Sequence, residues 1–73
     1  MATQIVMDHT GDTRHVFDAA DEIALAEAEN RFKELTGFGF TAAKRTGLGK
    51  SELIREFDPT AEETLFIPRF KGG

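Results

Sequence analysis

Residues 19–37, AADEIALAEAENRFKELTG, carry the clearest periodic pattern in the chain. This stretch is dense in alanine, glutamate and leucine, which are all good helix formers. Apolar side chains recur within it at steps of three and four residues, as they do along one face of a helix. The members of this stripe are Leu25, Ala28, Phe32 and Leu35. The pattern predicts one amphipathic helix over residues 19–36.

Residues that commonly cap helices mark both ends of this segment. Asp18 or Asp21 can accept hydrogen bonds from the free N–H groups of the first turn. Gly37 can adopt the left-handed conformation that ends many helices. We therefore expect the helix to stop at Gly37. Glu29 and Lys33 stand four apart in the order that favours ion pairing on the solvent face.

Two short runs rich in β-favouring residues precede the helix. They are Gln4–Asp8 and Arg14–Phe17, and the turn between them has Gly11 at its centre. This arrangement indicates a β-hairpin. Side chains alternate between the two faces of a strand. The buried face is therefore expected to hold Ile5, Met7 and Val16.

Three more strands are expected after the helix, over residues 38–45, 51–57 and 64–70. Glycines at residues 47–49 and Asp58-Pro59-Thr60 separate them. Pro68 cannot donate a ladder hydrogen bond, which places it at an edge, a bulge or the exit of the last strand. The predicted order is ββαβββ. This is an α+β, β-grasp-like fold with one helix packed across a small mixed sheet; the alternative is ββαββ with two plain hairpins.

The composition describes one small domain. The chain has 73 residues, 40% of them hydrophobic and 30% charged, and no cysteine. We expect a single domain over residues 1–70 and a flexible tail over residues 71–73. The N-terminus lacks the pattern of a secretory signal, and the apolar runs are too short to span a bilayer. These features predict a cytoplasmic protein without membrane contact.

The charge is unevenly distributed. Residues 1–36 carry eight acidic and three basic side chains, whereas residues 37–73 carry five acidic and six basic ones. The net charge of −4 argues against nonspecific binding to nucleic acid, which depends on neutralising phosphates. Aromatic and basic residues do interleave over residues 38–50, but no wider basic surface accompanies them. An acidic domain with a basic tail instead suits a protein partner of matched charge.

The last five residues, Arg69-Phe70-Lys71-Gly72-Gly73, are the most informative for function. Two glycines led in by basic residues make a thin segment that can thread into a narrow channel. The alternative interpretation is a frayed terminus, since chain ends are often loose.

The chain resembles the ubiquitin family at both of its ends. Gln4-Ile5 and the turn Thr10-Gly11-Asp12-Thr13 are similar to the first hairpin of ubiquitin. Thr64-Leu65 stands where ubiquitin has Thr-Leu before its last strand, and the Gly-Gly tail follows. In the β-grasp fold the first and last strands lie side by side in parallel, so both similarities belong to one feature. Residues 38–57 show no specific similarity.

The resemblance implies a role for each tail residue. Gly73 would be the reactive residue, its carboxylate adenylated by a separate ATP-using enzyme and passed to a thiol, an amine or a sulfur donor. Gly72 would keep the approach open, and Arg69, Phe70 and Lys71 would be recognised by that partner. The chain would then be a substrate and not an enzyme, with no cofactor of its own. Lys71 departs from the arginine of ubiquitin and lacks its planar donor fork.

Other motifs point to weaker alternatives. Residues 47–51, Gly-Leu-Gly-Lys-Ser, are similar to the end of a phosphate-binding loop but lack its first glycine and the following helix. His9 and His15 lack a convincing third metal ligand. Ser51 has no histidine placed to activate it. We expect a hairpin turn, no metal site and no catalytic residues.

Two functions of different classes remain open. The first is a ubiquitin-like modifier or carrier activated at Gly73 by a partner enzyme. The second is a non-covalent protein-interaction module of the same fold, docking through a sheet edge or face, with an inert tail. For both we expect a monomer.

Overall fold

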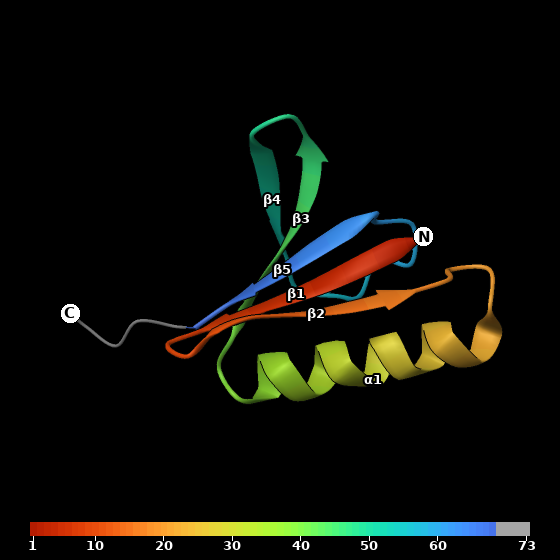
Figure 1. Ribbon diagram of the computed structural model, residues 1–73, viewed down its shortest axis with the longest axis horizontal. Helices are drawn as coiled ribbons and strands as arrows, with labels where there is room; N and C mark the ends of the chain where they lie inside the picture. The colour runs from red at the N-terminus through yellow and green to blue at the C-terminus, as the bar shows by residue number, and fades with distance from the viewer. Residues whose placement is uncertain (69–73) are drawn as a thin grey trace.

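The structure, a computed structural model, describes residues 1–68 and contains one helix and five strands in the order ββαβββ within that range. The elements are β1 (Ala2–Asp8), β2 (Gly11–Phe17), α1 (Glu22–Gly37), β3 (Thr41–Gly47), β4 (Lys50–Ile54) and β5 (Glu63–Ile67). α1 lies along one face of the sheet, and the β3–β4 hairpin extends away from the helix (Figure 1). The predicted order of elements is confirmed.

The strands form a single mixed sheet in the order β2-β1-β5-β3-β4. β1 pairs with β2 in antiparallel and with β5 in parallel, while β3 pairs in antiparallel with both β5 and β4. Because β5 pairs with β1 on one side and with β3 on the other, the last strand lies at the centre of the sheet. This pairing excludes the alternative of two plain hairpins, and the fold is α+β and β-grasp-like as predicted.

The hydrophobic core lies between α1 and the sheet. Phe66 of β5 is fully buried and packs edge-to-face on Phe32 of α1, with ring centroids 5.7 Å apart. Val6 and Ala42 join them from the neighbouring strands. Phe57, in the connection between β4 and β5, closes the cluster by a second edge-to-face contact with Phe32 at 6.0 Å. The central strand is therefore anchored by the largest buried side chain.

The buried face of the first hairpin differs from the prediction. Ile5 is buried as expected, but Met7 is only half-buried and Val16 is 61% exposed. The face toward α1 instead carries Val6 and Gln4. The alternation of apolar residues did not predict this face, because a glutamine is unexpected in a core. The polar side chain of Gln4 is tolerated there because it forms hydrogen bonds to α1.

The prediction is correct for the N-terminal end of α1 and wrong for its C-terminal end. Asp21 is the N-cap, and its carboxylate accepts hydrogen bonds from the N–H groups of Ile23 and Ala24. The helix does not stop with a left-handed Gly37, however, because Gly37 is its last helical residue. The left-handed position belongs to Gly39, with a φ of +101°. It allows the Phe40 N–H to bond the Leu35 carbonyl, as in a Schellman motif.

The strand boundaries after α1 differ from the prediction. Residues 38–40 form the helix cap, so β3 begins only at Thr41. Residues 55–57 leave the sheet because Phe57 turns into the core against Phe32. The end predicted at residue 70 lies outside the described residues, and within them β5 finishes at Ile67.

Candidate functional site

The predicted site residues Arg69, Phe70, Lys71, Gly72 and Gly73 lie outside the described residues. The structure does describe the strand that leads to them. β5 is the central strand, and its alternate residues Thr64 and Phe66 are buried, with exposures of 3% and 0%. The chain thus reaches Pro68 from a fixed position in the core.

Three structural features meet at the end of the sheet where β5 finishes. β1 and β5 run parallel, so the β1–β2 turn at His9-Thr10 lies at the same end as Pro68. The C-terminal end of α1 also lies there (Figure 1). Phe38, which caps α1, is 84% exposed although its N–H bonds the carbonyls of Glu34 and Leu35. A large aromatic ring is therefore held in solvent by an ordered backbone at this end.

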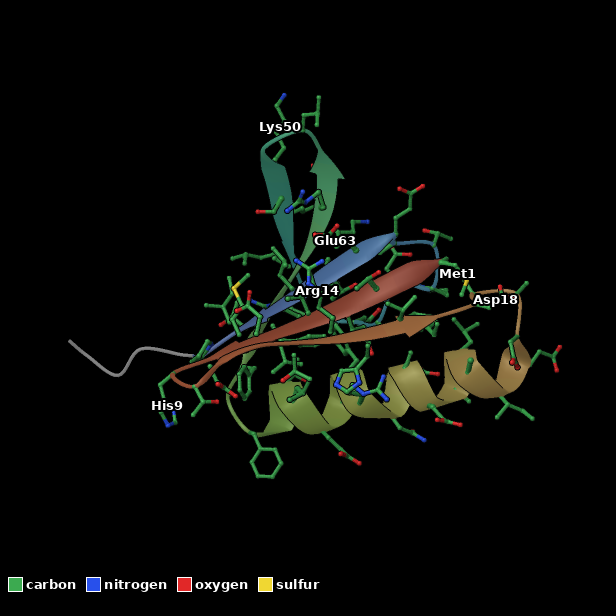
Figure 2. All side chains as sticks on the ribbon, viewed as in Figure 1. Met1, His9, Arg14, Asp18, Lys50 and Glu63 are labelled. Carbon is green, nitrogen blue, oxygen red and sulfur yellow. The ribbon has the colours of Figure 1, made fainter. Side chains whose placement is uncertain are left out.

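The β1–β2 turn is held by its own side chains. The carboxylate of Asp8 accepts hydrogen bonds from the Thr10 hydroxyl at 2.6 Å and from the Thr10 N–H at 2.7 Å. These bonds lower the pKa of Asp8 below its usual value. His9 projects from this turn (Figure 2). The turn is tighter than the sequence suggested, with two residues between the strands.

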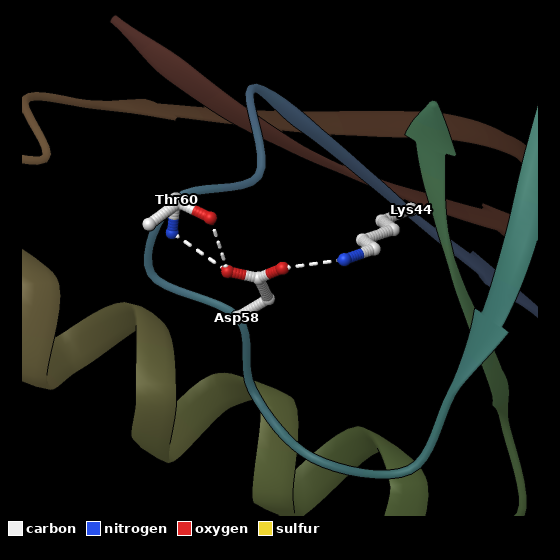
Figure 3. A network of polar contacts seen from close by, with 3 residues as sticks. All are labelled: Lys44, Asp58 and Thr60. Carbon is white, nitrogen blue, oxygen red and sulfur yellow. Dashed lines mark hydrogen bonds and ion pairs between the residues drawn. The ribbon is translucent and has the colours of Figure 1, made fainter. Parts of the chain in front are cut away.

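A polar network fixes the connection between β4 and β5. The Lys44 ammonium lies 2.7 Å from one carboxylate oxygen of Asp58, and the other oxygen accepts bonds from the hydroxyl and N–H of Thr60 (Figure 3). The bond from Lys44, followed by those from Thr60, holds the pKa of Asp58 well below its usual range. The bond to Asp58 likewise raises the pKa of Lys44. Since all three groups satisfy one another, the network positions the loop that enters β5.

A second network joins β1 to α1. The side-chain amide of Gln4, 1% exposed, donates to the Ala28 carbonyl at 3.0 Å and accepts from the Arg31 guanidinium at 2.8 Å. Burial, with a smaller contribution from the charge of Arg31, lowers the pKa of His15 on the neighbouring strand. His15 is therefore placed as a neutral side chain near neutral pH.

The structure separates the residues of the weaker motifs. Gly47-Leu48-Gly49-Lys50 forms the tip of the β3–β4 hairpin, with Leu48 fully exposed, instead of a loop leading into a helix. Ser51 is exposed on β4. Within residues 1–68, no three histidine or acidic side chains gather as metal ligands. No helix in the same range has the length and apolarity needed to cross a bilayer.

Sequence reasoning missed an apolar row on the sheet face away from α1. The strand registers align Ile5, Leu65, Ala43 and Leu53 across four strands. Ile5 and Ala43 are buried, Leu65 is half-buried and Leu53 is 72% exposed. Alternation within each strand contained this signal, but the row depends on the register between strands, which the sequence does not reveal.

Comparisons with known proteins returned no match: no family model, no curated protein and no solved structure is significantly similar to this chain.

Proposed function

We propose that this protein is a ubiquitin-like modifier or carrier whose Gly73 carboxylate is activated by a partner enzyme. The observation that carries the proposal is the path of the chain into the Gly-Gly segment. The β-grasp-like sheet has its last strand at the centre, fixed by the buried Phe66, and the segment Arg69–Gly73 follows one residue after that strand. A partner that binds the folded domain at the end of β5 therefore binds next to the start of the Gly-Gly segment.

The chemistry takes place at the partner. An ATP-dependent enzyme adenylates the Gly73 carboxylate with release of pyrophosphate, and a thiol, amine or sulfur donor then displaces AMP. Gly72 and Gly73 place no side chain in the way of this attack. Arg69 and Lys71 carry the positive charge, and Phe70 the apolar surface, that the partner recognises. The protein is a substrate in this scheme and needs no cofactor of its own.

The test compares three versions of the chain in its native host, each with an N-terminal tag. The wild-type chain is expected to give covalent adducts or a modified C-terminus. A chain lacking Gly72 and Gly73 is expected to give neither, while its melting temperature is unchanged. The matched control is Leu48→Ala, which alters an exposed residue at the far hairpin tip and should leave adduct formation intact. Adducts that persist without the two glycines would rule out Gly73 as the reactive residue.

The second candidate is a non-covalent interaction module, and the apolar row across the open sheet face favours it. On the sheet face away from α1, Leu53 is 72% exposed and Leu65 is half-buried, so both side chains can contact a partner there. Under this function, Leu53→Asp abolishes partner binding and removal of Gly72 and Gly73 does not. The two functions therefore respond in opposite ways to the same pair of variants.

A further inference from the structure

The two edges of the sheet differ in how well they are protected against pairing. β2 and β4 are the edge strands, so each has one row of backbone N–H and C=O groups without a neighbouring strand. β4 has five residues, and its register with β3 shifts between Arg45 and Gly47. β2 has seven residues, contains no proline, and pairs with β1 without a break from Gly11 to Phe17. β2 is thus the longer and more regular free edge.

Charges on β2 are arranged in a self-complementary way. Asp12 and Arg14 are two residues apart, so both side chains lie on one face of the sheet. Arg14 stands opposite Ile5 in the register, which places this pair on the face away from α1, as Figure 2 shows for Arg14. Both side chains are exposed, and neither takes part in an ion pair within residues 1–68.

We propose that two copies of this chain associate through their β2 edges in antiparallel, with Asp12 of each copy opposite Arg14 of the other. The two-fold axis then passes beside Thr13, and residues 11–15 of each copy align. Two five-stranded sheets become one continuous ten-stranded sheet. Directly opposite residues of an antiparallel pair have Cβ atoms about 5 Å apart, so both reciprocal ion pairs form in one register.

Competing registers and the other edge are less favourable. An axis at Arg14 aligns all seven residues but places Arg14 opposite Arg14 of the second copy, and like charges directly opposite are destabilising. At the β4 edge, Lys50 opposite Glu52 would also pair opposite charges. That register aligns only three strand residues, however, and lies beside the shift in the β3–β4 ladder. The β2 edge therefore combines length, regularity and charge complementarity.

A groove lies beside this edge. It runs between β2 and α1 and is lined in part by Phe17, Glu27 and Arg31. A two-fold axis perpendicular to the sheet brings the α1 helix of the second copy to the same face. The α1 side chains that line this groove include both an acidic and a basic residue, Glu27 and Arg31.

The expected association is weak and reversible, because a short edge-to-edge contact buries little surface. We expect a monomer at low concentration and a dimer that forms as the concentration rises. The proposal is independent of the Gly73 chemistry, because β2 lies at the opposite side of the sheet order from β3 and β4 and leaves β5 at the centre.

Sedimentation equilibrium over a concentration series tests the proposal. At low salt the wild-type chain is expected to approach twice its 8.1 kDa mass. Asp12→Arg and Arg14→Asp each replace two attractive pairs by two repulsive ones, and each should weaken the dimer by roughly tenfold or more. The double variant Asp12→Arg/Arg14→Asp restores opposite charges and should recover dimerisation. An equimolar mixture of the two single variants should form a heterodimer.

Lys50→Glu is the control, because it reverses a charge at the β4 edge and is expected to leave association unchanged. Circular dichroism confirms that every variant is folded. A wild-type chain that stays monomeric up to about 1 mM, at which even weak edge contacts associate, overturns the proposal. So does a dimer whose affinity is unchanged by both charge reversals, or a double variant that fails to recover dimerisation.

Discussion

Replacement of Phe66 by alanine tests how firmly the central strand is anchored. Phe66 is fully buried in β5, packs on the ring of Phe32 and belongs to one cluster with Val6 and Ala42. Truncating a buried phenylalanine to alanine typically costs about 3–5 kcal/mol, which includes the lost transfer energy and the cavity left behind. The loss of the edge-to-face aromatic contact places Phe66→Ala toward the upper part of that range.

The cost is large relative to the total stability of such a small domain. At about 0.05–0.15 kcal/mol per residue, 73 residues give roughly 4–11 kcal/mol for unfolding. Phe66→Ala should therefore lower the melting temperature by at least about 12 °C. If the wild-type chain lies at the low end of this stability range, little of the variant is folded at 37 °C. The size of this loss measures how strongly Phe66 holds β5, the strand that leads into the Gly-Gly segment.

Urea unfolding followed by circular dichroism measures this change, because the chain has no tryptophan or tyrosine to report by fluorescence. The matched control is Phe38→Ala, which removes the same atoms from a side chain that is 84% exposed. Its free energy of unfolding should change by no more than about 0.5 kcal/mol. Equal effects of the two variants, or a cost below about 1 kcal/mol for Phe66→Ala, would refute the assignment of the core.

Four further variants test other parts of the fold. Asp21→Ala removes the N-cap of α1 and should cost about 1 kcal/mol by urea unfolding, whereas Asp18→Ala should cost less because Asp18 bonds only the N–H of Ala20 outside the helix. Gln4→Met keeps the side-chain volume but loses the bonds to α1, and should cost about 1 kcal/mol. The folded pKa of His15 is lowered, so the unfolded chain binds its proton more readily; this contribution to stability is complete above pH 6.5 and is lost as the pH falls below it. His15→Gln should reduce the slope of unfolding free energy against pH below pH 6.5, and an unchanged slope would contradict the partial burial of His15 on β2.

The order of elements could be predicted because each signal is local. The helical stripe of Ala28 and Phe32 and the capping carboxylate of Asp21 depend on neighbours within a few residues. Each of these features is present in the structure as the sequence indicated. The parallel pairing of β1 with β5 followed from the family resemblance of the two ends, and the sheet topology confirms it.

Features that depend on distant partners could not be predicted. Gln4 is buried because an α1 carbonyl and Arg31 satisfy it, and these groups are 24 and 27 residues away. The choice between Gly37 and Gly39 as the left-handed residue depends on which N–H reaches the Leu35 carbonyl. The tail residues of the candidate site could be named from the sequence alone. The free edge at β2 could not, because it depends on the order of the strands in the sheet.

Mass spectrometry of the C-terminus shows whether the Gly73 carboxylate is the reactive group. The chain is expressed with an N-terminal tag in its native host, and intact masses and C-terminal peptides are recorded by mass spectrometry under several growth conditions. The account predicts Gly73 joined through its carbonyl to a lysine amine, or present as a thiocarboxylate. A Gly73 that carries only a free carboxylate under every condition, while partners are held without a covalent bond, would contradict it.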